Sequence, residues 1–160
     1  MRVELTPPLI LGAASPHGQG TRPPAVLKAA AQVQDTVVQI AAVITGGGGE
    51  DAGKTGASVF GALADAVKGG KSLDLTDKGQ VGAVIDTAAG KSGVQLPPEV
   101  KDAASSVVGN LNQAKEDAVS QSGSGLDAAI AISQIQTHAQ GVAAESLGNL
   151  AAGKGDADAL

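Results

Sequence analysis

Apolar residues recur along the chain at alternating spacings of three and four, the period of helices that bury one face. The first such run lies between Ala25 and Ile44. Its apolar positions are Val26, Ala30, Val33, Val37, Ile40 and Ile44. Pro24 precedes the run, where a missing N–H costs nothing, and the glycines at 46–49 end it. The spacing predicts a helix over 25–44 that buries this stripe.

Four further helices are predicted between glycine-rich breaks. We expect them over 57–68, from a cap at Thr76 or Asp77 to Gly90, over 97–118 and over 126–152. The predicted inner faces, in chain order, are Phe60, Leu63 and Val67; Val81, Val84, Ile85 and Ala88; Val100, Ala104, Val107, Leu111, Ala114 and Ala118; and Ala128, Ile132, Ile135, Ala139 and Val142. In the last helix, Leu126, Ile130, Leu147 and Leu150 widen the predicted face. Isolated helices of this length are marginal in water, so packing of these faces must hold them. The pattern therefore predicts an all-α bundle of about five helices with glycine-rich connections.

Residues 1–24 differ in composition from the rest and form a predicted N-terminal arm. They hold five of the seven prolines, which fix φ and remove backbone donors, so no helix is expected there. We interpret this stretch as a flexible arm or as an artefact of the start site. The bundle is then 25–153, and 154–160 form an acidic Gly/Asp tail.

Composition removes several classes of function. The chain has no Cys, which excludes disulfide frameworks and thiol chemistry. It has 11 basic and 16 acidic residues, a net charge of −5 and one aromatic residue, so neither a basic surface nor a stacking platform for nucleic acid is expected. No apolar run approaches the roughly 18 residues of a membrane span. These counts favour a scaffold or binding role over nucleic-acid or membrane functions.

The segment from Gly48 to Thr55 matches the phosphate-binding pattern G-x-x-x-x-G-K-[ST] through Gly48, Gly53, Lys54 and Thr55. Such a loop follows a strand and aims free backbone N–H groups at phosphate. Here the preceding segment has a helical period, and two acidic residues lie inside the loop. We interpret the segment as a glycine-rich interhelical loop, with a nucleotide-binding protein as an alternative.

Acidic residues in the predicted loops indicate a candidate metal site. Ca²⁺ is bound by carboxylate and carbonyl oxygens on flexible loops, and the candidates are Asp74, Asp77, Asp156 and Asp158. A metal-dependent hydrolase could use these ligands, with His138 as a possible base. Helix capping by Asp74 and Asp77 and a solvated surface position for His138 are the simpler interpretations. No cofactor is expected, with calcium as the possible exception.

Several segments resemble a known family. These are 26–34, the Leu63-Ala64-Asp65-Ala66-Val67 helix with its glycine break, Leu73-Asp74-Leu75-Thr76-Asp77, and the closing segment 134–158. They are similar to Ala-rich helical segments of repeats-in-toxin (RTX) bacterial surface proteins, which bind calcium and are exported by type I secretion. The resemblance implies a location outside the bacterium or on its surface, and it offers no catalytic residues.

These observations lead to one principal hypothesis. We expect a non-catalytic helical spacer or interaction module of an exported, calcium-associated surface protein. Its partners would be neighbouring domains of a larger chain or a second copy, because stripes of small residues can pair between chains as well as within one. A calcium-dependent hydrolase, a P-loop nucleotide-binding protein and a cytoplasmic helical binding protein are the alternatives.

Overall fold

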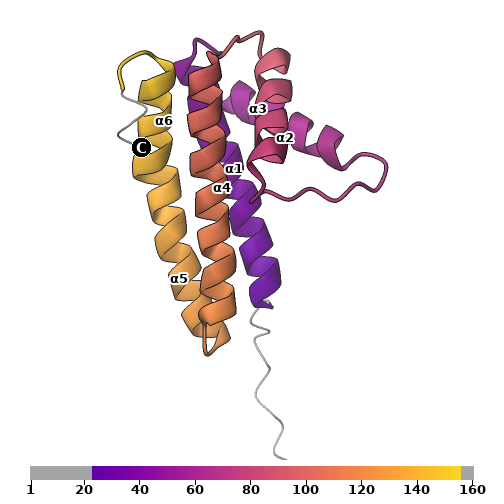
Figure 1. Cartoon of the computed structure of the whole chain (residues 1–160), viewed down its shortest axis with the longest axis vertical. Helices are drawn as coiled ribbons and strands as arrows, with labels where there is room; N and C mark the ends of the chain where they lie inside the picture. Colours follow the sequence, from indigo (N-terminus) through magenta and orange to yellow (C-terminus); the bar gives the residue numbers. More distant parts are fainter. Residues whose placement is uncertain (1–22, 156–160) are drawn as a thin grey trace, which may run out of the picture.

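The computed structural model describes residues 23–155, and their regular structure is entirely helical (Figure 1). The elements are α1 (Pro24–Gly46), α2 (Ala52–Val67), α3 (Lys78–Lys91), α4 (Pro98–Gln121), α5 (Gly125–His138), the π-helical segment η1 (Ala139–Ala143) and α6 (Ala144–Ala151). The last three follow one another without a break, so the described chain forms five rods. This confirms the predicted all-α bundle of about five helices. Most of the N-terminal arm, together with Asp156 and Asp158 of the tail, lies outside the described residues.

The rods form a bundle with two different halves. Figure 1 shows α1, α4 and the α5–α6 rod along the long axis, with α2 and α3 against the upper half only. The upper half therefore has an apolar core shared by all five rods. Its fully buried side chains include Ile40, Ile44, Val59, Val81, Ile85, Val108 and Leu147. The lower half has only three helices, so each covers less of its neighbours.

Side-chain caps define the starts of α2 and α3. The Asp51 carboxylate accepts from the N–H groups of Gly53 and Lys54 at 3.0 and 3.2 Å, and Asp77 accepts from the Gln80 N–H at 2.8 Å. A capping carboxylate satisfies N–H groups that have no partner inside the helix. The Asp51 cap starts α2 at Ala52, five residues before the predicted start at 57.

The inner face of α3 is as predicted, whereas in α2 only Leu63 is buried as predicted. Val81, Val84, Ile85 and Ala88 are all buried. In α2, by contrast, Phe60 and Val67 are 56% and 45% exposed. The buried residues of α2 are Thr55, Val59, Ala62 and Leu63. Because α2 packs against both α1 and α3, the smaller side chains one position away form the contact, and the Phe60 ring is left outside.

The π-helical segment changes which residues of the last helix face inward, and the predicted burial of Val142 was wrong for this reason. A π turn inserts about one extra residue, which rotates every later side chain around the helix axis. Val142 therefore points outward and is 61% exposed, although the sequence pattern placed it on the inner face. Ala143 and Ala144 are buried instead. Ala128 and Ile132, upstream of the segment, and Ala139, at its start, are buried as predicted. Leu147 and Leu150 are also buried as predicted, whereas the prediction was wrong for Leu126 and Ile130, which are exposed.

The backbones of α1 and α6 approach each other closely at Gly46 and Gly148. A Cβ atom on Gly46 would lie 2.1 Å from the Gly148 carbonyl oxygen, which is part of the backbone and cannot rotate away. Glycine at 46 therefore sets the distance between the two helices.

We expect Gly46→Ala to lower the free energy of unfolding by about 1–3 kcal/mol, because the helices must move apart. Gly90→Ala is the matched control, since a Cβ at this helical position meets open space. The control should raise stability by roughly 0.5–1 kcal/mol through helix propensity. Urea unfolding followed by circular dichroism measures both. Equal effects of the two substitutions would contradict the close approach.

Candidate functional site

The lower half of α1 has its polar face inside the bundle. Gln32, Asp35, Thr36 and Gln39 are at most 8% exposed, although α1 is otherwise rich in apolar residues. Their spacing of three, one and three places them on one helical stripe. Polar side chains are rarely buried this completely unless partners satisfy them. The partners come from α4 and from the α5–α6 rod.

An ion pair lies at the centre of this polar face. Nζ of Lys115, on α4, lies 2.8 Å from Oδ2 of Asp35, and the two side chains are 0% and 1% exposed. Lys115 Nζ also donates to Oδ1 of Asn112 at 3.0 Å. Burial of the ammonium lowers the pKa of Lys115 below its ordinary value of 10.5, and the neighbouring Asp35 carboxylate only partly offsets this.

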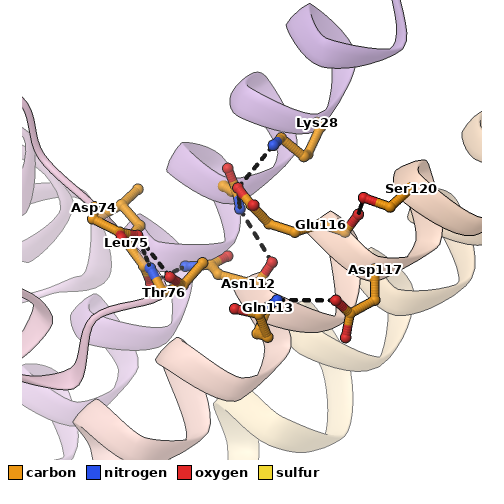
Figure 2. A network of polar contacts seen from close by, with 10 residues as sticks. Lys28, Asp74, Leu75, Thr76, Asn112, Gln113, Glu116, Asp117 and Ser120 are labelled. Carbon is orange, nitrogen blue, oxygen red and sulfur yellow. Dashed lines mark hydrogen bonds and ion pairs between the residues drawn. The ribbon is translucent and has the colours of Figure 1, made fainter.

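Asn112 connects three parts of the chain. Its Nδ2 group donates to Oγ1 of Thr36 on α1 and to the carbonyl oxygen of Leu75, both at 3.0 Å. Figure 2 shows Asn112 of α4 between α1 and the connection that carries Asp74, Leu75 and Thr76. The buried amide therefore fixes the loop between α2 and α3 against the bundle, since an unpaired buried amide costs about 1–3 kcal/mol.

Two glutamines connect the polar face to the π-helical segment. Gln140, inside the segment, donates from Nε2 to Oδ1 of Asp35 at 2.7 Å. Gln39 donates from Nε2 to the carbonyl oxygen of Ala139 at 3.2 Å. A π turn disturbs the regular backbone ladder, and side-chain donors can satisfy the carbonyls that it leaves. We call Gln32, Asp35, Thr36, Gln39, Asn112, Lys115 and Gln140 the buried polar network.

The outer edge of the buried polar network faces solvent through an ion pair. Lys28 Nζ lies 2.7 Å from Oε1 of Glu116. Figure 2 shows this ion pair between α1 and α4. Beside it, Gln32 donates to the Asn112 carbonyl at 3.1 Å. These contacts continue the α1–α4 interface toward the lower end of the bundle. The pair is partly exposed and adds little stability by itself.

The sequence pattern predicted the buried face of α4 correctly in its first turns and was wrong by one residue position beyond Ala104. Val100 and Ala104 are buried as expected, but Val107, Leu111, Ala114 and Ala118 are only half-buried. The buried positions beyond Ala104 are Ser105, Val108, Gly109, Asn112 and Lys115. The expectation was wrong there because it treated only apolar residues as core. The sequence did contain a signal for this polar interface. The polar residues of α1 at 32, 35, 36 and 39 form a stripe whose period is as regular as that of the apolar stripe.

The apolar stripe of α1 is exposed where the polar face is buried. Val26 and Val33 are 53% and 38% exposed, and Ala30 between them is also exposed. The prediction that this part of the stripe is buried was therefore wrong, whereas Val37, Ile40 and Ile44 are buried as expected. We call Val26, Ala30 and Val33 the α1 stripe.

The α1 stripe borders a shallow apolar hollow. The hollow has a volume of about 680 Å³ and extends from Val26 to Phe60 of α2. Its lining is Val26, Ala29, Ala30, Val33, Gln34, Val37, Val38 and Phe60, so it contains no charged side chain. Exposed apolar surface that is gathered in one place on a soluble domain typically marks an interaction site.

The segment that matches the phosphate-loop pattern connects two helices. Gly48 lies in the loop after α1, while Gly53, Lys54 and Thr55 lie in the first turns of α2. The Asp51 carboxylate already accepts the N–H groups of Gly53 and Lys54, and Nζ of Lys54 lies 3.1 Å from Glu50. Thr55 is buried and shares a hydrogen bond with Thr45 at 3.1 Å. This helix–loop–helix arrangement differs from the strand–loop–helix arrangement of a nucleotide-binding loop.

Of the predicted metal and catalytic residues, Asp74 and Asp77 lie next to each other at the start of α3 and His138 ends α5, while Asp156 and Asp158 lie outside the described residues. The Asp74 carboxylate accepts from the hydroxyl and N–H of Thr76 at 2.7 and 2.9 Å, contacts that hold the pKa of Asp74 below its ordinary value, and Asp77 caps α3. His138 ends α5 beside a hollow whose lining contains no acidic residue. Within 23–155, no three acidic or histidine side chains are grouped so that they could hold a metal ion. Among the helices of this range, none is long and apolar enough to cross a membrane.

Comparison of the chain with protein-family models, with curated proteins and with solved structures gives no match. The features of the chain that bear on its function are the buried polar network and the exposed apolar surface beside it.

We expect Lys115→Met to lower the free energy of unfolding by about 3–5 kcal/mol, because Asp35 is left as a buried charge without a counter-ion. The double variant Asp35→Asn, Lys115→Met keeps an acceptor for Gln140 and removes both charges, so it should be more stable than Lys115→Met alone. Lys101→Met is the control, since its ion pair with Asp86 is partly exposed, and it should cost less than about 1 kcal/mol. Urea unfolding measures all three variants. A double variant that is no more stable than Lys115→Met would contradict a coupled pair.

The lowered pKa of Lys115 predicts how stability depends on pH. Between the folded-state pKa and the unfolded value near 10.5, the unfolded chain binds more protons than the folded chain. The free energy of unfolding should therefore rise with pH in that window, and the cost of burying the charged lysine is fully present below it. The measurement is the difference in unfolding free energy between the parent and the Asp35→Asn, Lys115→Met variant, from neutral pH to 10.5. A difference that falls over this range would contradict the direction of the shift.

Proposed function

We propose that the chain is a non-catalytic helical spacer and interaction module of an exported, calcium-associated bacterial surface protein, and that its partner is a second copy of the same bundle. The observation that carries the interaction role is the reversed burial of α1. Its polar stripe is inside the lower half of the bundle, and the α1 stripe is outside. The location and the calcium association rest on the resemblance to RTX-type helical segments.

The energetics of this arrangement support an external role for the α1 stripe. Full burial of a valine or phenylalanine side chain stabilises a fold by about 1.5–3 kcal/mol. Because Val26, Val33 and Phe60 are exposed, they contribute only part of this energy to the bundle. Burying an ion pair is itself costly, because both charges lose water. The lower part of α1 leaves its apolar side exposed and buries a charged one. Its apolar side chains can therefore gain hydrophobic burial from a partner that the bundle itself does not provide.

Charge and spacing favour a second copy as that partner. The chain has a net charge of −5, so two copies repel each other through most of their surface. The hollow beside the α1 stripe has no charged lining, which makes it a face where two copies can meet without repulsion. Val26, Ala30 and Val33 are spaced by four and three, as in the seam between paired helices. A symmetric pair uses the same patch on both copies.

The buried polar network supports a structural role rather than a catalytic one. Asp35 and Lys115 have almost no solvent contact, so a substrate has no route to either group. The larger hollow between α1, α2, the π-helical segment and α6 is lined mainly by alanine and glycine, and its one ionisable lining residue is Glu145. The hydrolase and nucleotide-binding alternatives stay predictions that no feature of these residues favours.

We expect the full chain to form dimers as its concentration rises and Val33→Asp to remain monomeric, because a carboxylate at the seam must lose water on pairing. Gln134→Asp is the matched control, since it adds the same charge at an exposed position of α5. Sedimentation equilibrium over a concentration series measures association, and circular dichroism checks that each variant is folded. Equal association of Val33→Asp and the control would contradict the role of the α1 stripe.

A further inference from the structure

Residues 1–22, which lie outside the described residues, immediately precede the end of α1 that carries the α1 stripe. Residues 1–22 lead directly into Pro23, the N-cap of α1, and Val26 lies in the first turn of that helix. These 22 residues contain Leu9-Ile10-Leu11, three large apolar residues in succession. No charged residue occurs between Glu4 and Arg22. The Leu9-Ile10-Leu11 run thus has the same chemical character as the hollow, which is apolar and uncharged.

The length of this segment is sufficient to bring the apolar run onto the α1 stripe. Leu11 stands twelve residues before Pro23, a stretch that spans roughly 40 Å when extended. Val26 and Val37 are separated by only roughly 16 Å along a helix axis. The run can therefore return along α1 and reach any point of the hollow. Pro16 restricts the intervening chain, which reduces the conformational entropy lost when the chain is held in place.

Tethering favours this segment over any free partner. A segment joined by a short flexible linker is present near its binding site at an effective concentration in the millimolar range. A second copy must compete from solution, where protein concentrations are typically far lower. With comparable apolar contacts, the tethered segment occupies the hollow first.

We propose that Leu9-Ile10-Leu11 docks on the α1 stripe and limits its pairing with a second copy. Docking covers the exposed parts of Val26, Val33 and Phe60 within one chain. The regulatory half of this inference rests on the proposed function, whereas the docking itself does not. Pairing then requires the segment to leave the stripe, so the apparent dimer affinity is reduced by the fraction of chains in which the stripe is free.

The absence of Trp and Tyr from the chain allows a direct test of docking. Val33→Trp places the only indole of the protein on the α1 stripe, and its emission wavelength reports whether water reaches it. The full chain with Val33→Trp is compared with the same chain carrying Ile10→Asp, at a concentration where sedimentation shows monomers. Gln19→Asp is the matched control, because it adds the same charge to the segment outside the apolar run. We expect a red shift with Ile10→Asp and no shift with the control; identical emission from all three proteins would overturn docking.

Sedimentation of the chain with native Val33 tests the regulatory half. Ile10→Asp should strengthen dimerisation about tenfold relative to the parent and to Gln19→Asp, because the stripe is released. Unchanged or weaker dimerisation of Ile10→Asp would overturn the regulation. If parent and Ile10→Asp both stay monomeric at all concentrations while the red shift is present, the proposed pairing fails and the docking stands. If dimers form but Ile10→Asp changes neither the indole emission nor the dimer affinity, docking fails and the proposed function stands.

Discussion

The Asp35–Lys115 ion pair sets how the helices of the lower bundle are rotated. With three helices in that half, each helix can turn only one face inward, and an ionised pair that is almost fully buried must keep its partners. Once Asp35 points inward, the helical period carries Gln32, Thr36 and Gln39 inward with it. The same period turns Val26 and Val33 outward. Exposure of the α1 stripe is therefore a direct consequence of the buried pair.

The π-helical segment belongs to the same arrangement. Gln140 reaches Asp35 from inside the segment, and Gln39 donates to the Ala139 carbonyl at its start. The inserted residue lets the last rod present Gln140 to the polar network below and Leu147 to the apolar core above. One local irregularity thus joins a polar lower half to an apolar upper half. The close contact of Gly46 with Gly148 then holds α1 and α6 together near the upper end.

The two halves suit different tasks. The upper half, with five rods around an apolar core, provides most of the hydrophobic burial. The lower half relies on specific polar contacts and leaves an uncharged apolar surface beside the α1 stripe. In this view the N-terminal segment and a second copy compete for that surface. Under the proposed function, this competition would control when two copies associate.

Local signals in the sequence determined the fold class, the approximate helix limits and the inner face of α3. Glycine breaks, prolines at helix starts and the capping Asp77 act within a few residues, so they can be read without knowledge of neighbours. The sequence could not decide which of two equally regular stripes on α1 faces inward. That choice depends on Lys115 and Asn112, which lie about 80 residues away on α4. The π-helical segment and the outward turn of Val142 likewise depend on contacts with Asp35 and Gln39. Tertiary structure decided these features because a buried polar group is stable only where its partner is present.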